Sequence, residues 1–241
     1  MSSEIVNSFR KENLDSYLKE LAKEYRKLGG KALPAEIVLI GGAAIIANYG
    51  FRNMTIDIDA VIHAASVMKE AINNVGDKFN LPAGWLNADF MHTLSYSPKL
   101  EQYSVYYKSF CGVLDVRTVS AEYLIAMKLC SGRKYKNDLS DIIGILHEHK
   151  KRNMPITMSQ ISQAVMNLYG GWEHISVDSQ KFIQDVMEKD NLEVVYNNIK
   201  SEEKHSKEIL TDFEQDYPGI MNGDNVDNIL YNLKTKRTEQ S

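Results

Sequence analysis

Residues 36–62 read EIVLIGGAAIIANYGFRNMTIDIDAVI, and this stretch carries the strongest structural signals in the chain. The aliphatic run at 36–40 ends at Gly41-Gly42, a pattern that predicts a buried strand followed by a tight turn. The small apolar residues of 43–49 predict a short helix that begins at the glycines and ends at Gly50. We therefore expect a strand, a glycine turn and a helix in immediate succession.

The end of the same stretch places two carboxylates close together. Residues 55–62 (TIDIDAVI) alternate with a period of two, so a strand here would carry Asp57 and Asp59 on one face. Such a pair repels itself unless a divalent cation lies between the carboxylates, and hard oxygen ligands suit Mg²⁺ or Mn²⁺. Glycines at a helix N-terminus also let backbone N–H groups approach a phosphate. Together these features indicate a site for a metal-bound nucleoside triphosphate.

The elements outside this stretch suggest two parts of different architecture. Helices are predicted over 13–28, 67–79, 124–130 and 139–149, the last capped by Asn137, and strands over 103–110 and 112–119. Whether these two strands form a hairpin stays open. After a polar joint at 147–152, only helices are predicted, over 157–168, 177–187, 192–199 and 203–213, and the polar residues 233–241 are expected to fray. We therefore expect an α/β (α+β) domain over 1–150, with a small mixed sheet flanked by helices, and a helical domain over 151–241.

Composition limits the kind of protein. The 241 residues have a formal net charge of −4 and are 44% hydrophobic, which indicates a packed globular protein and argues against a nucleic-acid coat, although a local basic patch is still allowed. The N-terminus is charged from residue 4 onward and no apolar run is long enough to span a membrane. A cytoplasmic protein without a membrane anchor is expected.

A second group of charged residues follows the predicted strands. Lys128 closes an apolar helical run, and Arg133 follows where that helix should end, so an ammonium and a guanidinium are available to a triphosphate. Asp138 and Asp141 are spaced i, i+3 on one face of the next helix. Three roles stay open for these two carboxylates: orienting Arg133 or Lys128, joining the metal site, or capping the helix.

These residues together resemble the nucleotidyltransferase superfamily of the DNA polymerase β type. That pattern, hydrophobic-Gly-Gly followed by hydrophobic-Asp-hydrophobic-Asp, is matched here by residues 40–42 (IGG) and 56–60 (IDIDA). The chain is most similar to the AbiEii-type toxin nucleotidyltransferases. Their Arg-x-x-Thr-x-Asp-x-Asp motif is matched by residues 52–59 (RNMTIDID), and their second motif by 123–129 (YLIAMKL), Arg133 and 138–142 (DLSDI).

The resemblance implies a role for each matched residue. Asp57 and Asp59 would hold Mg²⁺ (or Mn²⁺), while Asp115 on the strand 112–119 could add a third carboxylate, unless it is an ion-pair partner of Arg117. The nucleotide would be bound by Gly41, Gly42, Arg52, Thr55, Lys128 and Arg133. The residues implied in catalysis are Asp57, Asp59, Lys128 and Asp138.

The implied reaction is the Mg²⁺-dependent transfer of a nucleoside monophosphate from an NTP to a hydroxyl acceptor on tRNA or protein. The resemblance also implies a toxin of a toxin–antitoxin or phage-defence system, with a cognate antitoxin as a possible partner. Two alternatives stay open: a non-catalytic nucleotide-binding or interaction module with the same fold, and a phosphotransferase that uses the same site.

Overall fold

The protein divides into two compact units in the computed structural model, which describes residues 8–223 and 225–239. Of the described residues, the first unit comprises 8–127 and 159–171, and the second comprises 128–158, 172–223 and 225–239. These units do not coincide with the predicted division after residue 150, which stays a prediction about domains.

The first unit is built on a five-stranded mixed sheet with the order β3-β2-β1-β5-β4. The strands are β1 (Ala35–Leu39), β2 (Ile58–His63), β3 (Leu86–Asn87), β4 (Ser104–Phe110) and β5 (Leu114–Val119). The central strand β1 pairs antiparallel with β2 and parallel with β5, and β4 and β5 form an antiparallel hairpin. The carboxyl ends of β1 and β5 therefore lie at the same edge of the sheet as the start of β2.

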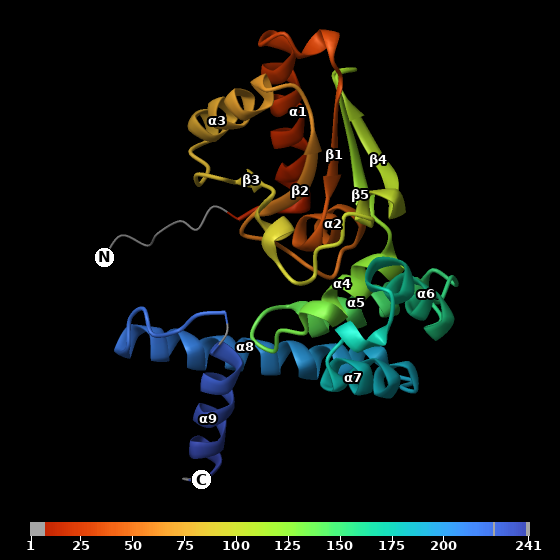
Figure 1. Cartoon of the computed structure of the whole chain (residues 1–241), viewed down its shortest axis with the longest axis vertical. Coiled ribbons are helices and arrows are strands. Elements are labelled where there is room, and N and C mark those ends of the chain that lie inside the picture. The colour runs from red at the N-terminus through yellow and green to blue at the C-terminus, as the bar shows by residue number, and fades with distance from the viewer. Residues whose placement is uncertain (1–7, 224, 240–241) are drawn as a thin grey trace. The chain divides into compact units, whose positions relative to one another are not determined.

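Of the described helices, four lie wholly or almost wholly within the first unit. They are α1 (Lys11–Lys27), α2 (Gly41–Asn48), α3 (Val67–Phe79) and α6 (Met158–Tyr169). Figure 1 shows α1 and α3 side by side next to the sheet, and these two helices contact each other. Leu14, Leu18 and Leu21 of α1 are fully buried, as are Ile37 and Leu39 of β1, because the helix presents a leucine at every third or fourth position.

The second unit is helical. Its helices are α5 (Asp138–Lys151), α7 (Val177–Met187), α8 (Leu192–Asp216) and α9 (Val226–Glu239), and the division between the units falls within α4 (Ala121–Ser131). Helix α5 packs against α8, and α8 and α9 share an apolar core formed by Ile209, Leu210, Val226 and Leu230. Short 3-10 turns occur at 30–32, 89–92, 100–103 and 172–174.

The predicted fold class and most predicted elements are confirmed, and the hairpin that stayed open is present. Three expectations are wrong. Strand β2 begins at Ile58 rather than residue 55, since Ile56 is 55% exposed and has no core to enter. Residues 192–216 form one helix instead of two, because Glu203 and Ser206 are buried and continue the packed stripe.

The third wrong expectation concerns the C-terminal end. Helix α9 continues to Glu239, because Val226 and Leu230 anchor it on α8, whereas residues 233–241 were expected to fray. Residues 240–241 lie outside the described part of the chain. Within the described ranges, no helix has the length and apolarity needed to cross a membrane.

Candidate functional site

Gly41 places the start of α2 next to the Asp59 carboxylate. Its backbone has φ +54°, in the left-handed region that glycine tolerates and other residues adopt at a cost. A β-carbon at Gly41 would lie 3.5 Å from Asp59 Oδ2, and the amide of Ile40 donates to the Asp59 carbonyl at 2.9 Å. The predicted glycine turn and the predicted carboxylate therefore meet at one edge of the sheet.

Gly42 is packed even more tightly, against two other residues predicted to bind nucleotide. A β-carbon here would lie 2.5 Å from Thr55 Oγ1 and 2.9 Å from a guanidinium nitrogen of Arg52. Real side chains do not approach so closely, so only glycine fits at this position without displacing Thr55 or Arg52. We call Gly41, Gly42, Arg52, Thr55, Asp57 and Asp59 the Gly–Asp group.

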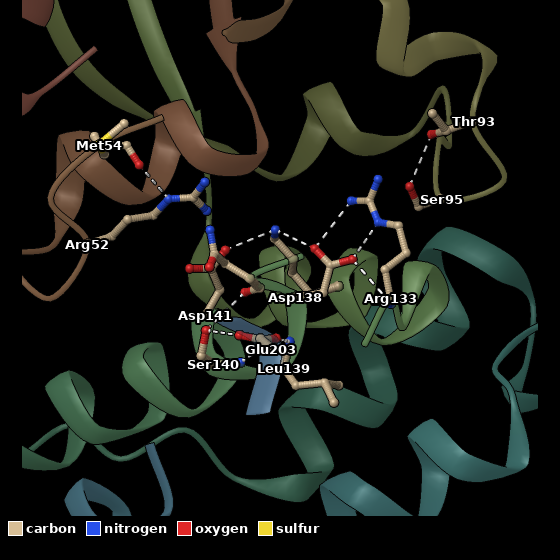
Figure 2. Close-up of polar contacts among 12 residues, drawn as sticks. Arg52, Met54, Thr93, Ser95, Arg133, Asp138, Leu139, Ser140, Asp141 and Glu203 are labelled. Carbon is tan, nitrogen blue, oxygen red and sulfur yellow. Dashed lines mark hydrogen bonds and ion pairs between the residues drawn. The ribbon is translucent and has the colours of Figure 1, made fainter. Parts of the chain in front are cut away.

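The loop between α2 and β2 is held by backbone contacts. Thr55 pairs with Phe9 in an isolated antiparallel bridge, in which each amide donates to the other residue's carbonyl, at 2.8 and 2.9 Å. Phe9 is itself buried and stacks on Trp85. The Arg52 side chain donates from Nε to the Met54 carbonyl at 3.0 Å (Figure 2). The bridge thus fixes Thr55 next to Gly42.

The two carboxylates of the Gly–Asp group retain access to solvent. Asp57 is exposed and Asp59 half-buried, while Ile58 between them is fully buried. Among the described residues, no group of three or more His, Cys, Asp or Glu side chains could hold a metal ion. Mg²⁺ is commonly bound through only one or two carboxylates together with substrate phosphates. The pair therefore fits a magnesium ion that arrives with a nucleotide.

Asp115 is not brought to this edge of the sheet. On β1, Glu36 pairs with Asp115 of β5 on one side and with His63 of β2 on the other. His63 lies four residues along β2 from Asp59. That offset corresponds to about 13 Å along the strand direction. Arg117 is on the same face but donates to Ser104, at 2.8 Å from Nε to Oγ and at 2.7 Å from Nη2 to the carbonyl oxygen.

The second unit contains a buried network of opposite charges. Lys128 Nζ lies 2.7 Å from Asp138 Oδ1 and 3.0 Å from Asp141 Oδ2, and Arg133 Nε donates to Asp138 Oδ2 at 2.7 Å. Figure 2 shows the Arg133 guanidinium directed at the Asp138 carboxylate. The side chain of Lys128 is 10% exposed and that of Arg133 33%. We call Lys128, Arg133, Asp138 and Asp141 the Lys–Asp cluster.

The electrostatics of this cluster keep Asp138 ionised. Burial alone would raise the pKa of Asp138, but the adjacent Lys128 and Arg133 outweigh it and hold that pKa well below its ordinary value. Of the three roles that sequence left open for Asp138 and Asp141, the contacts favour the first, since both carboxylates hold Lys128 and Asp138 also holds Arg133. Asn137 stands at the N-cap position as expected, but its side chain makes no capping hydrogen bond.

A residue that sequence reasoning missed completes this region. The Glu203 carboxylate on α8 accepts hydrogen bonds from the Leu139 and Ser140 amides, at 2.9 and 3.2 Å, and a further one from the Ser140 hydroxyl (Figure 2). Burial raises the pKa of Glu203 to about 7, although these donors favour its ionised form. Nothing in the sequence around Glu203 distinguishes it from the solvated glutamates of a helix, so no local signal could have identified it.

The comparisons with known proteins bear on the first part of the chain. Residues 16–146, more than half of the 241 residues, match a family described as a nucleotidyltransferase of unknown function (DUF6036). Neither a curated protein nor a solved structure matches the chain. The match includes every residue of the Gly–Asp group and of the Lys–Asp cluster, but neither Phe9 nor Glu203.

Proposed function

The chain belongs to the family of nucleotidyltransferases of unknown function DUF6036, and from that premise we propose that it moves a nucleoside monophosphate from an NTP to a hydroxyl acceptor. The observation that carries the proposal is the packing of Gly42 against Thr55 and Arg52, next to the Gly41–Asp59 contact. This packing holds a glycine helix start, a cation and a carboxylate in one place. A metal-bound triphosphate requires that combination of groups.

Each residue of the Gly–Asp group has a part in the proposed reaction. Asp57 and Asp59 hold Mg²⁺, and the backbone amides at Gly41-Gly42 and the Arg52 guanidinium bind the triphosphate. Thr55 fixes the loop that carries Arg52 and Asp57. When bound, the metal supplies Lewis-acid stabilisation of the charge that develops on the phosphoryl oxygens.

The bonding changes define the reaction class. The acceptor oxygen forms a bond to the α-phosphorus, the bond from that phosphorus to the α,β-bridging oxygen breaks, and pyrophosphate leaves in line with the attack. The acceptor's hydroxyl proton is released to solvent. Asp115 has no part in this scheme, because it lies about 13 Å along the sheet from Asp59.

The resemblance to the AbiEii-type enzymes assigns Lys128 and Arg133 to the nucleotide, and on that ground we propose that the Lys–Asp cluster takes part in the same reaction. Lys128 and Arg133 offset the charge of the triphosphate and of the leaving pyrophosphate. Asp138 and Asp141 act through these two cations, because their carboxylates contact Lys128 and Asp138 also contacts Arg133. Cations held in advance need no reorganisation when charge develops, which favours catalysis.

The acceptor and the biological setting follow from the resemblance to the AbiEii-type toxins. We propose tRNA or another protein as the acceptor, cytoplasmic action as the toxin of a toxin–antitoxin or phage-defence pair, and a cognate antitoxin as partner. The net charge of −4 does not favour extended RNA contacts, so an RNA acceptor would meet a local patch such as Arg133, Lys134 and Lys136.

Label transfer tests the function directly. The protein is incubated with Mg²⁺ and each α-³²P-labelled NTP in turn, with and without total bacterial tRNA. We expect label on one acceptor, and we expect the double variant Asp57→Asn with Asp59→Asn to lose at least about a hundredfold in rate, because metal-ion stabilisation contributes several kcal/mol. Asp77→Asn, an exposed change on α3 of the same unit, is the control.

The released product separates this proposal from its alternatives. Pyrophosphate supports nucleotidyl transfer, whereas a nucleoside diphosphate identifies a phosphotransferase. Mg²⁺-dependent NTP binding without any product identifies a non-catalytic nucleotide-binding module. Transfer that survives the double variant would contradict the assigned mechanism.

A further inference from the structure

Glu203 is a buried carboxylate that the proposed reaction does not use. It lies within α8, beyond the segment that matches the family, and only 4% of the residue is exposed. Burying a carboxylate costs free energy unless hydrogen bonds satisfy its oxygens. Both Glu203 oxygens accept hydrogen bonds, and all three donors belong to Leu139 and Ser140. The side chain is therefore directed at one short segment of α5.

That segment is the first turn of α5, where the backbone needs an acceptor. The amides at the start of a helix have no partner within it, and a side chain at the N-cap usually supplies one. The Asp141 amide is the first to bond within α5, to the Asn137 carbonyl at 2.9 Å, and the Asn137 side chain makes no capping bond. Glu203 bonds the second and third amides instead, from a position more than sixty residues away in the chain.

The same turn carries the acidic members of the Lys–Asp cluster. Asp138 directly precedes Leu139, and Asp141 directly follows Ser140. Asp138 holds both Lys128 and Arg133, and its Oδ2 also accepts from the Arg133 amide at 3.4 Å. Glu203 therefore contacts Leu139 and Ser140, and the residues adjacent to these two in sequence, Asp138 and Asp141, contact the cations.

We propose that Glu203 is a positioning residue of the transfer reaction: by capping α5 it sets Asp138 and Asp141, which in turn set Lys128 and Arg133. This inference rests on the proposed function, because it assigns Glu203 to the same reaction. It makes α8 a part of the machinery that orients the cations. The contact between α5 and α8 then serves catalysis as well as folding.

The test compares three variants of the intact protein. In Glu203→Ala the cap is lost, in Glu203→Gln the amide oxygen can still accept from Leu139 and Ser140, and Ile209→Ala truncates a buried side chain of α8 that packs on α9 instead. For each we measure the rate of label transfer from α-³²P-NTP at saturating NTP, the apparent KM for NTP, the melting temperature, and hydrogen exchange at the Leu139 and Ser140 amides.

The expected pattern separates positioning from structural support. Glu203→Ala should lower the rate at saturating NTP by about tenfold to a hundredfold, because a small displacement of a catalytic group has that effect. Glu203→Gln should stay within about threefold of the wild type, which corresponds to less than about 1 kcal/mol. Ile209→Ala should lower the melting temperature as much as Glu203→Ala but leave the rate within about the same threefold range. Exchange at Leu139 and Ser140 should accelerate only in Glu203→Ala.

Other results overturn the inference. Equal losses of rate in Glu203→Ala and Ile209→Ala would make Glu203 a structural residue only, and a loss in Glu203→Gln as large as in Glu203→Ala would mean that its charge, not its capping, matters. Unchanged exchange in Glu203→Ala would show that Glu203 does not hold the turn. A wild-type protein that transfers no label refutes the proposed function instead, while the exchange data still test the cap.

Discussion

The Gly–Asp group and the Lys–Asp cluster differ in whether their charged side chains are exposed to solvent or paired with one another. In the first, Gly42 has no side chain and so leaves room for Thr55 and Arg52. Its carboxylates stay exposed or half-buried at the edge of a sheet. In the second, Lys128 and two carboxylates are buried, the half-buried Arg133 adds a second cation, and the opposite charges neutralise one another. The first arrangement leaves negative charge for a cation that arrives with a ligand. The second fixes the positions of its cations before any ligand is bound.

The difference also shows in what each region requires of its neighbours. The Gly–Asp group depends on close steric fit, so adding one methyl group should disturb it. The Lys–Asp cluster depends on charge balance in a buried environment, where an unpaired ion is costly. Substitutions that alter only volume or only charge should therefore affect the two regions unequally.

The largest effect is expected from Asp138→Asn. This change keeps the shape of the side chain but removes the charge that holds the buried Lys128 and the half-buried Arg133. Breaking a buried ion pair such as Lys128–Asp138 typically costs about 3–5 kcal/mol. Urea denaturation followed by far-UV circular dichroism measures the loss. Asp178→Asn is the matched control, because Asp178 pairs with Lys134 at the same 2.7 Å but is 74% exposed. The control should lose less than about 1 kcal/mol, and equal losses would show that burial does not set the strength of these pairs.

A slightly smaller effect is expected from pH, with opposite signs for two carboxylates of the second unit. The pKa of Glu203 is raised from 4.5 to about 7 by burial in the folded protein. Between these two pH values the unfolded chain has lost the Glu203 proton while the folded protein still holds it. Stability should fall by up to about 3 kcal/mol as pH rises from 4.5 to 7, and then level off. The pKa of Asp138 is lowered, so its contribution is present above pH 3.8 and lost below it. Urea midpoints across this pH range test both signs.

The variant Glu203→Gln tests the pH dependence assigned to Glu203 separately from that assigned to Asp138. In this variant the decline between pH 4.5 and 7 should flatten, since no group titrates at position 203, while the loss of stability below pH 3.8 should be unchanged. A decline of the same slope in Glu203→Gln would assign the titration to another group.

Gly42→Ala should have an intermediate effect, confined to the Gly–Asp group. The added methyl group would lie 2.5 Å from Thr55 Oγ1 and 2.9 Å from an Arg52 nitrogen, so at least one of the two must move. Transfer should slow by about tenfold to a hundredfold, measured with labelled NTP. Gly50→Ala in the following loop is the control, because a β-carbon there meets nothing within 4 Å. Equal rates for the two variants would mean that the fit around Gly42 does not matter.

The smallest effect is expected from Asp115→Asn. Because Asp115 lies about 13 Å along the sheet from Asp59, its charge is too distant to share a metal ion with Asp57 and Asp59. The transfer rate should stay within about twofold of the wild type, less than about 0.5 kcal/mol. Asp59→Asn, measured beside it, should nearly abolish transfer. A large loss in Asp115→Asn would restore it as a third carboxylate.

The sequence predicts the local features of both regions well. The Gly41-Gly42 turn, the strand before it and the helix after it depend on neighbouring residues, and local patterns capture them. The start of β2 was misplaced, since alternation at 55–62 does not reveal where core contacts end. Alternation also placed Asp115 and Arg117 on one face of β5. It could not show that Asp115 stands at the opposite end of the sheet, which depends on β5 running parallel to β1.

Long-range contacts are what the sequence could not provide. Sequence leaves contact of Asp138 with Arg133 or Lys128 as one of three open roles, and its simultaneous contact with both depends on the loop between α4 and α5. Glu203 and Phe9 are invisible to any local pattern, because each acts on a segment more than forty residues away. Glu203 is buried whereas its neighbour Glu202 is exposed, and this difference depends only on which side of α8 faces α5.

The bridge between Phe9 and Thr55 bears on whether the segment that matches the family can be separated from the rest of the chain. Residues 16–146 are the part of the chain that matches the family, yet a fragment cut to those bounds would lose Phe9 at one end and Glu203 at the other. Each removed residue leaves backbone donors of the retained part without their partners. The segment that matches the family therefore does not satisfy all of its own backbone groups, and the flanking regions supply the missing partners.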